Sequence, residues 1–174
     1  SDSLVGGFGA VAAEPSLPAG RGPMHAAALL ELQQTLQREM PICTPMGIRP
    51  VSWDGRELAM EMPLAPNRNH QYSAFAGSLN ALCTIVGWGT VFLLLHHEGR
   101  DGNIVIRRSN IRFLRPVRDE MIVARGLPLE ATGEEFFYEL LRSKGHSKID
   151  VATEIADAAG PLVSFQGSYV VQNK

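Results

Sequence analysis

Residues 67–84, NRNHQYSAFAGSLNALCT, place polar side chains that could take part in chemistry beside an apolar run of this 174-residue chain. Two asparagines and a histidine, Asn67, Asn69 and His70, lie in a polar stretch directly ahead of an apolar run. Amide and imidazole groups can orient a water molecule or a carbonyl group, and an imidazole can also accept a proton. We therefore expect this stretch to form one side of a reaction site.

The apolar run that follows has no charged side chain between Gln71 and Leu95. A bilayer span needs about 20 apolar residues, but this run contains glycines and hydroxyl and amide side chains, and no basic cluster flanks it. The strands predicted on both sides also need a core to cover. We therefore predict no membrane span but a helix over 77–95 that is buried inside a domain.

The small and polar residues of this helix recur at spacings of three and four, so Gly77, Asn80, Thr84 and Trp88 share one stripe. Near Gly77 and Ser78, the first backbone N–H groups have no partner within the helix and carry the positive end of its dipole. A glycine there lets a substrate carbonyl approach closely. This arrangement can hold a developing oxyanion.

Periodicity on both sides predicts the elements that position this helix. Apolar residues at helical spacing predict a helix over 24–39, and the pair Asp54-Gly55 predicts a hairpin between two alternating segments. A short helix is expected over 133–143, begun by a capping box of Thr132 and Glu135 and ended by Gly145. Further strands are expected over 103–114, 117–126, 147–157 and 162–172.

Within the strand over 103–114, simple alternation places Ile104 and Ile106 on the same face as Arg108. Six strands with short connections around one apolar helix indicate a single α+β domain over 24–174. Residues 1–23, rich in Gly, Ala, Pro and Ser, are expected to be a flexible leader or linker.

Composition and charge argue against several classes of function. The net charge of −2 indicates no basic surface for nucleic acid. Cys43 and Cys83 lie far apart and form no CxxC motif, which fits a reducing compartment, and we expect the cytoplasm. The five histidines show no metal-ligand spacing with cysteine or carboxylate residues. We therefore expect neither a metal nor a resident cofactor.

Taken together, these residues resemble the hotdog-fold acyl-CoA thioesterase superfamily. The segment NHQYSAFAGSLNAL is similar to the one that opens the central helix in those enzymes. The pattern of Asn67, Asn69, His70, AFAGSL and Gly87-Trp88 most resembles a bacterial thioesterase-like domain that is often fused to an N-acetyltransferase. IRRSNIRFLRPVRDE resembles the strand and turn that come next. The resemblance covers about residues 38–172.

The resemblance implies a hotdog fold, in which a curved antiparallel sheet wraps around a long central apolar helix. It implies homodimers or dimers of dimers, with the site at the dimer interface. The substrate would be an acyl-CoA or an acyl-carrier protein, so that coenzyme A is part of the substrate. The expected reaction is hydrolysis of the thioester by attack of water on its carbonyl group.

Site residues follow from the motif and from the stripe. Asn69 matches the loop asparagine that positions water or the carbonyl, and Gly77 matches a glycine at the helix N-terminus. The expected catalytic residues are Asn69, His70, Gly77, Ser78 and Thr84.

Arginine can bind phosphate through two parallel hydrogen bonds, so the run of five arginines over 107–118 could hold the phosphates of coenzyme A. The expected substrate-binding residues are Asn67, Phe75, Asn80, Arg107, Arg108 and Arg115.

Three departures from the family pattern keep other functions open. Phe75 stands where better-known relatives carry a histidine, Ala76 where they carry a first glycine, and Thr84 where they carry the catalytic aspartate. No Asp or Glu lies between residues 71 and 97. Threonine can orient water but needs a separate base, and His70 is the nearest candidate. The alternatives are a non-catalytic module that binds acyl thioesters and another reaction on the same fold, such as dehydration of a hydroxyacyl thioester.

Overall fold

The computed structural model describes residues 19–20 and 22–174, so residues 1–18 and 21 of the predicted leader lie outside the described residues. The elements, in chain order, are β1 (Ala19–Gly20), α1 (Pro23–Glu39), α2 (Cys43–Met46), β2 (Arg49–Trp53), β3 (Leu58–Pro63), the 3-10 helix η1 (Ala65–Asn67), α3 (Ala76–His97), β4 (Asn103–Phe113), β5 (Met121–Gly126), α4 (Ala131–Lys144), β6 (Ser147–Asp157) and β7 (Gly160–Gln172).

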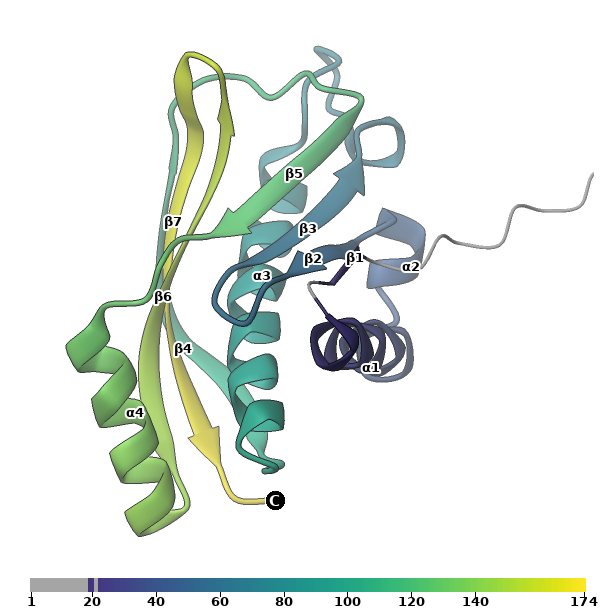
Figure 1. Ribbon diagram of the computed structural model, residues 1–174. Helices are drawn as coiled ribbons and strands as arrows, with labels where there is room; N and C mark the ends of the chain where they lie inside the picture. The colour runs from purple at the N-terminus through teal and green to yellow at the C-terminus, as the bar shows by residue number, and fades with distance from the viewer. Residues whose placement is uncertain (1–18, 21) are drawn as a thin grey trace, which may run out of the picture.

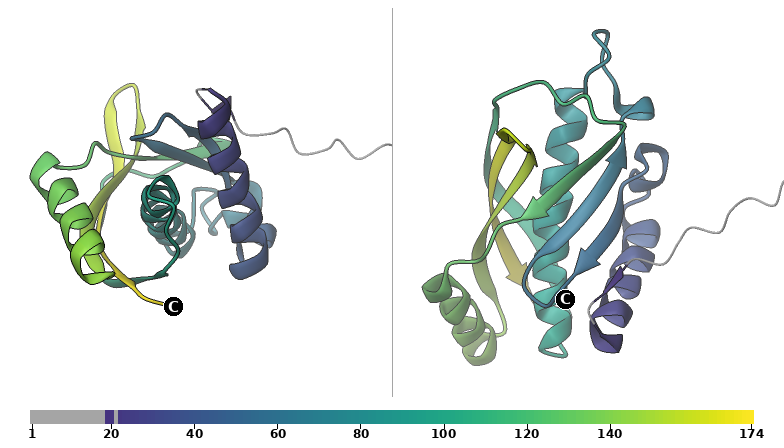
Figure 2. Two further views of the ribbon diagram at one scale, coloured as in Figure 1. Left: turned by 60° about the horizontal axis from the view of Figure 1, so that its bottom comes forward. Right: turned by 45° about the horizontal axis from the view of Figure 1, so that its top comes forward.

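The strands form one sheet in the order β1-β2-β3-β5-β6-β7-β4. All neighbouring pairs are antiparallel except β1 and β2, which are parallel. The sheet curves around α3, as Figure 1 shows from the side and the left view of Figure 2 shows nearly along the helix. This is the α+β hotdog arrangement that the sequence predicted. The two-residue strand β1 adds to it from the segment expected to be a leader.

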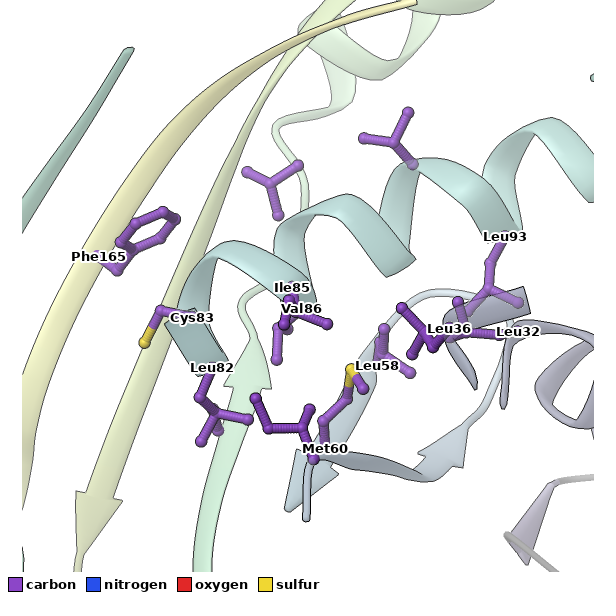
Figure 3. Close-up of a cluster of buried hydrophobic side chains, with 14 of the residues drawn as sticks. Leu32, Leu36, Leu58, Met60, Leu82, Cys83, Ile85, Val86, Leu93 and Phe165 are labelled. Carbon is purple, nitrogen blue, oxygen red and sulfur yellow. The ribbon is translucent and has the colours of Figure 1, made fainter. Parts of the chain in front are cut away.

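The core lies between α3 and the concave face of the sheet. Leu82, Cys83 and Val86 on α3 are fully buried against residues such as Met60 of β3 and Phe165 of β7 (Figure 3). In the described part of the chain, α3 is the one helix long and apolar enough to cross a membrane, and most of it is buried within the domain. A core helix surrounded by a sheet needs apolar residues on nearly all sides, which accounts for its composition.

Two outer helices complete the domain. α1 packs over β2 and α3 and buries Leu29, Leu32 and Leu36, while α4 packs against β6 and adds Phe137 and Leu141 to the core (Figure 2). Gly145 ends α4 in the left-handed region, with φ 73°, as predicted. The predicted capping box is wrong. The helix starts at Ala131, so Thr132 already lies within its first turn, and no side chain caps it.

A β-bulge in β4 changes which side chains face the core. Ile104 and Ile106 pair with Val171 and Tyr169, and the register then shifts before Arg108 pairs with Ser168. Because directly paired residues point to the same side of a sheet, Ile104, Ile106, Ile111 and Phe113 face α3, and Arg108 and Arg112 face outward. The prediction that Ile104 and Ile106 share a face with Arg108 is therefore wrong, since one extra residue at Arg107 reverses the alternation.

Candidate functional site

The loop ahead of α3 is held by the side chain of Asn69. Its Oδ1 atom accepts hydrogen bonds from the backbone N–H groups of Gln71 (2.9 Å) and Ser73 (3.2 Å). Its Nδ2 group donates to Ser73 Oγ (2.9 Å) and to the Ala74 carbonyl (3.5 Å). An amide has two donors and one acceptor atom, so both donors of Asn69 serve the loop. The Asn69 side chain therefore shapes the loop.

Asn67 ties the same loop to the rest of the domain. It is only 3% exposed, and its Nδ2 group donates to the Met46 and Pro63 carbonyls, both at 2.8 Å. Its own carbonyl accepts from the Phe75 N–H at 2.7 Å. This bond fixes the residue that precedes α3. Asn67 is thus buried, and both of its side-chain donors bind backbone carbonyl groups that hold the loop.

No side chain caps the N-terminus of α3. Phe75 is the N-cap residue, and because its side chain is a hydrocarbon it makes no capping hydrogen bond. Within the described residues, the backbone N–H groups of Ala76, Gly77 and Ser78 have no acceptor. A Cβ atom at Gly77 would lie 2.6 Å from the Phe75 ring. Glycine at this position therefore lets the ring lie across the first turn. Ala76 and Gly77 are exposed, whereas Ser78 is buried.

The tip of the loop presents exposed and strained residues. Tyr72 has φ 59°, in the left-handed region that non-glycine residues rarely adopt, and is 69% exposed. The guanidinium of Arg68 lies over its ring at 4.6 Å. His70 is exposed and forms no hydrogen bond to any described residue. Strained backbone of this kind is common at functional sites, and here it lies beside the open helix N-terminus.

One stripe of α3 remains half-buried while most of the helix is covered. It runs at four-residue spacing through Asn80, Thr84, Trp88, Phe92 and His96. Thr84 Oγ1 lies 3.4 Å from Asn80 Oδ1, so the amide nitrogen of Asn80 stays available. Further along, the rings of Trp88 and Phe92 stack with centroids 5.5 Å apart. The stripe therefore joins a polar pair near the helix N-terminus to an aromatic surface.

The position of the stripe is fixed by contacts on both sides. Trp88 Nε1 donates to the Ile104 carbonyl of β4 at 3.2 Å, and His96 pairs with Glu31 of α1 at 2.8 Å. The stripe thus lies between the edge strand β4 and α1.

Cys83, one position from Thr84, faces the core instead, and burial raises the pKa of its thiol to about 12. A thiol with that pKa is not a nucleophile at neutral pH.

The predicted arginines lie in two separate places. Arg107 and Arg108 line a surface pocket of about 420 Å³ with Lys148, Ser168 and Phe136, and Arg108 Nε lies 3.3 Å from Ser168 Oγ. Arg115 instead binds both carboxylate oxygens of Asp157, at 2.7 and 3.1 Å, and the Gly160 carbonyl at 2.9 Å. Arg115 is therefore fully engaged in the β6–β7 turn, apart from the other two.

Sequence reasoning missed the partners of Arg107 and Arg108. Lys148 and Ser168 come from β6 and β7, and Phe136 comes from α4. They converge only because β7 lies between β6 and β4 and α4 packs against β6. Nothing in the local pattern of any one segment indicates this. Phe92 was missed as well, although it continues the predicted stripe by one further turn.

Comparison with known families and structures identifies the family of this chain. A model of the family described as "Putative thioesterase (yiiD_Cterm)" matches residues 29–173. The chain belongs to this family. A structure from Shewanella oneidensis named "putative thioesterase" shares 30% identity over 83% of this chain and 97% of its own, with a TM-score of 0.75. A protein of unknown function from Chlorobaculum tepidum shares 27% identity over 86% of this chain and 96% of its own, with a TM-score of 0.79.

More distant structures share the fold alone. A thioesterase from Haemophilus influenzae is 17% identical over 83% of this chain and 90% of its own, with a TM-score of 0.62. The resemblance to hotdog-fold thioesterases is confirmed by the family match and by the topology. Membership of this thioesterase family supports thioester hydrolysis as the general activity.

Proposed function

We propose that this protein hydrolyses an acyl thioester of coenzyme A or of a carrier protein by attack of water on the thioester carbonyl. The open N-terminus of α3 carries this proposal. Three N–H groups without acceptors, at the positive end of a 22-residue helix, are suited to the carbonyl oxygen as it becomes negatively charged. The accessible polar pair of Asn80 and Thr84 lies one to two turns further along.

In this proposal, water is held by the hydroxyl of Thr84 and the amide of Asn80. Its oxygen attacks the carbonyl carbon, the oxyanion is held near Gly77 and Ser78, and the thiolate leaves as the C–S bond breaks. His70, exposed on the loop, is the candidate base that accepts the proton of the attacking water. Asn69 acts as a positioning residue, because its side chain holds the loop.

We also propose that the site is completed by a second copy of the chain. β4 is an 11-residue edge strand that pairs only with β7 among the described strands. Two of its core-facing side chains, Ile106 and Phe113, are 37% and 50% exposed. A long, partly apolar edge offers unpaired backbone groups to another strand. A homodimer joined along β4 would also cover the stripe of α3, which lies next to this edge.

Arg107, Arg108 and Lys148 are proposed to bind phosphate groups of coenzyme A. Three cationic side chains and the exposed ring of Phe136, which is 46% exposed, share one pocket. Guanidinium groups match phosphate geometry, and an aromatic ring can stack on a nucleotide base. The carboxylate of Asp150 also lines this pocket, but it accepts a hydrogen bond from Ser168 at 2.6 Å.

Release of free thiol from a panel of acyl-CoAs and acyl-carrier proteins tests the reaction. We expect time-dependent thiol release that is proportional to enzyme concentration. The second candidate function, a binding module without catalysis, is favoured by the absence of any carboxylate on α3. Saturable binding of acyl-CoA without thiol release would support that module and rule out hydrolysis.

A further inference from the structure

The uncovered surface of α3 beyond Thr84 is a single file of side chains. Between Thr84 and His96 every residue of the helix is buried except Trp88 and Phe92, which are half-buried. These four side chains follow one another at four-residue spacing, so each lies about 6 Å along the helix axis from the next. A ligand that extends from Thr84 along the surface of α3 therefore contacts this helix at Trp88 and Phe92 before it reaches His96.

Trp88 and Phe92 together form an apolar surface two turns long. Their rings stack with centroids 5.5 Å apart and planes 18° apart, and the Phe92 ring stacks in turn on the His96 ring at 6.4 Å and 23°. The single polar atom of the Trp88 ring, Nε1, donates to the Ile104 carbonyl. The two rings are therefore left to make hydrocarbon contacts.

This apolar surface is bounded by polar groups at both ends. At one end lie the Thr84 hydroxyl and the Asn80 amide, 3.4 Å apart. At the other end, His96 Nε2 lies 2.8 Å from the Glu31 carboxylate of α1. A hydrocarbon placed against that pair would remove water from polar atoms without replacing its hydrogen bonds, which is unfavourable. An apolar ligand on the two rings therefore has a limited length.

We propose that the acyl chain of the substrate lies on Trp88 and Phe92 and that the His96–Glu31 pair limits it to about ten carbon atoms. This inference rests on the proposed hydrolysis, in which Thr84 holds water beside the thioester carbonyl. Phe92 follows Thr84 by eight positions, or about 12 Å along the helix. An extended chain of about ten carbons spans that distance, because its bonds are about 1.5 Å long. The partner copy proposed to join along β4 would cover the chain from outside.

Hydrolysis of acetyl-CoA, decanoyl-CoA and palmitoyl-CoA tests the length limit through the release of free thiol. Palmitoyl-CoA is kept below the concentration at which it forms micelles. We expect kcat/KM for decanoyl-CoA to exceed that for each of the other two by at least about tenfold. Acetyl-CoA leaves both rings uncovered, and the last methylene groups of palmitoyl-CoA meet the His96–Glu31 pair.

Two variants separate the ring surface from the limit at its end. Phe92→Gln should lower the ratio of kcat/KM for decanoyl-CoA to that for acetyl-CoA by about tenfold. His96→Ala removes a ring and the partner of Glu31, and it should raise the ratio for palmitoyl-CoA to decanoyl-CoA by about tenfold. His97→Ala, an exposed neighbour outside the stripe, is the matched control and should change neither ratio. Each ratio compares two substrates of one variant, so it does not depend on how much of that variant folds.

The outcomes distinguish this inference from the proposed hydrolysis. Equal kcat/KM for all three substrates, or unchanged ratios in both variants, overturns the length limit while hydrolysis stands. If no thiol is released, hydrolysis fails, and binding then tests the ring surface. The chain has two tryptophans, and decanoyl-CoA should shift the indole NMR signal of Trp88 saturably, more tightly than acetyl-CoA, and leave the buried Trp53 unchanged. A Trp88 signal that does not respond overturns the inference.

Discussion

The hydroxyl of Tyr169 donates a hydrogen bond to the backbone carbonyl of Thr84 at 2.7 Å. This bond joins β7 to the turn of α3 that carries the polar stripe. Tyr169 is fully buried, and Gly87 leaves the space that its ring occupies. The sheet thus fixes the position of Thr84 through its backbone, while the Thr84 side chain remains accessible to a substrate.

Replacing Gly87 with alanine should destabilise the fold. A Cβ atom at Gly87 would overlap the hydroxyl of Tyr169, so the helix or the strand must move. Overpacking of this kind costs about 1–3 kcal/mol, and urea unfolding would measure it. Gly133→Ala on α4 is the matched control, because no atom lies within 4 Å of its added methyl group. The free energy of unfolding of this control should rise by about 0.5 kcal/mol, because alanine is favoured over glycine inside a helix. Equal effects of the two substitutions would contradict the close approach of Tyr169.

Stability should fall at alkaline pH. Burial raises the pKa of Cys83 from 9.0 to about 12 and that of Tyr138 to about 12. As pH rises above about 9, the unfolded chain releases these protons first, and the free energy of unfolding decreases through the folded-state pKa. Below about pH 9 both groups are protonated in the folded and the unfolded chain, and their full contribution to the free energy of unfolding is present. Urea unfolding at several pH values should show that the free energy of unfolding falls less steeply with rising pH in Cys83→Ala than in the wild-type protein. Identical slopes would refute this assignment.

Removing the side chain of Asn69 should increase the opening of the loop, and any loss of hydrolysis should be a consequence of that opening. Asn69→Ala deprives the Gln71 and Ser73 N–H groups of their acceptor. Loss of one such bond corresponds to about tenfold faster amide exchange, which hydrogen exchange would measure at these two residues. Asn173→Ala, at an exposed C-terminal position, serves as the control. If Asn69→Ala abolished hydrolysis while exchange stayed unchanged, a direct catalytic role would replace the positioning role.

The arginines should differ in their effect on coenzyme A recognition. Arg107→Gln and Arg108→Gln each remove a cation from the surface pocket and should raise KM for acyl-CoA by about tenfold. Acyl-pantetheine lacks the nucleotide, so its KM should stay the same in these variants. Arg115→Gln is the control, because that guanidinium is held by Asp157. A comparable rise in KM for Arg115→Gln would show that the phosphates bind elsewhere.

Much of the fold could be predicted because its signals are local. Alternation marked the strands, and the uncharged run marked α3, because a helix enclosed by a sheet needs apolar residues on every side. Gly145 indicated the end of α4 through its left-handed backbone. The bulge at Arg107 could not be predicted, since an extra residue in a strand is fixed by pairing with β7 rather than by sequence period.

The candidate site was predictable only in part. The open helix N-terminus and the stripe follow from helical geometry, so Gly77, Asn80 and Thr84 could be named from the sequence. The engagement of Asn69 within its own loop could not, because it depends on a tight turn through Tyr72 in the left-handed region. The separation of Arg115 from Arg107 depends on Asp157, which lies more than 40 residues away along the chain.

The most direct test of the central claim is the rate of thiol release by wild type and Thr84→Val. This substitution keeps the shape of the side chain and removes the hydroxyl proposed to hold water. We predict thiol release by the wild-type protein and a fall in kcat of at least about tenfold in the variant. Thr90→Val, whose hydroxyl bonds the Val86 carbonyl at 2.8 Å within the same helix, should retain activity. No thiol release from any acyl-CoA or acyl-carrier protein, or full activity in Thr84→Val, would contradict the account.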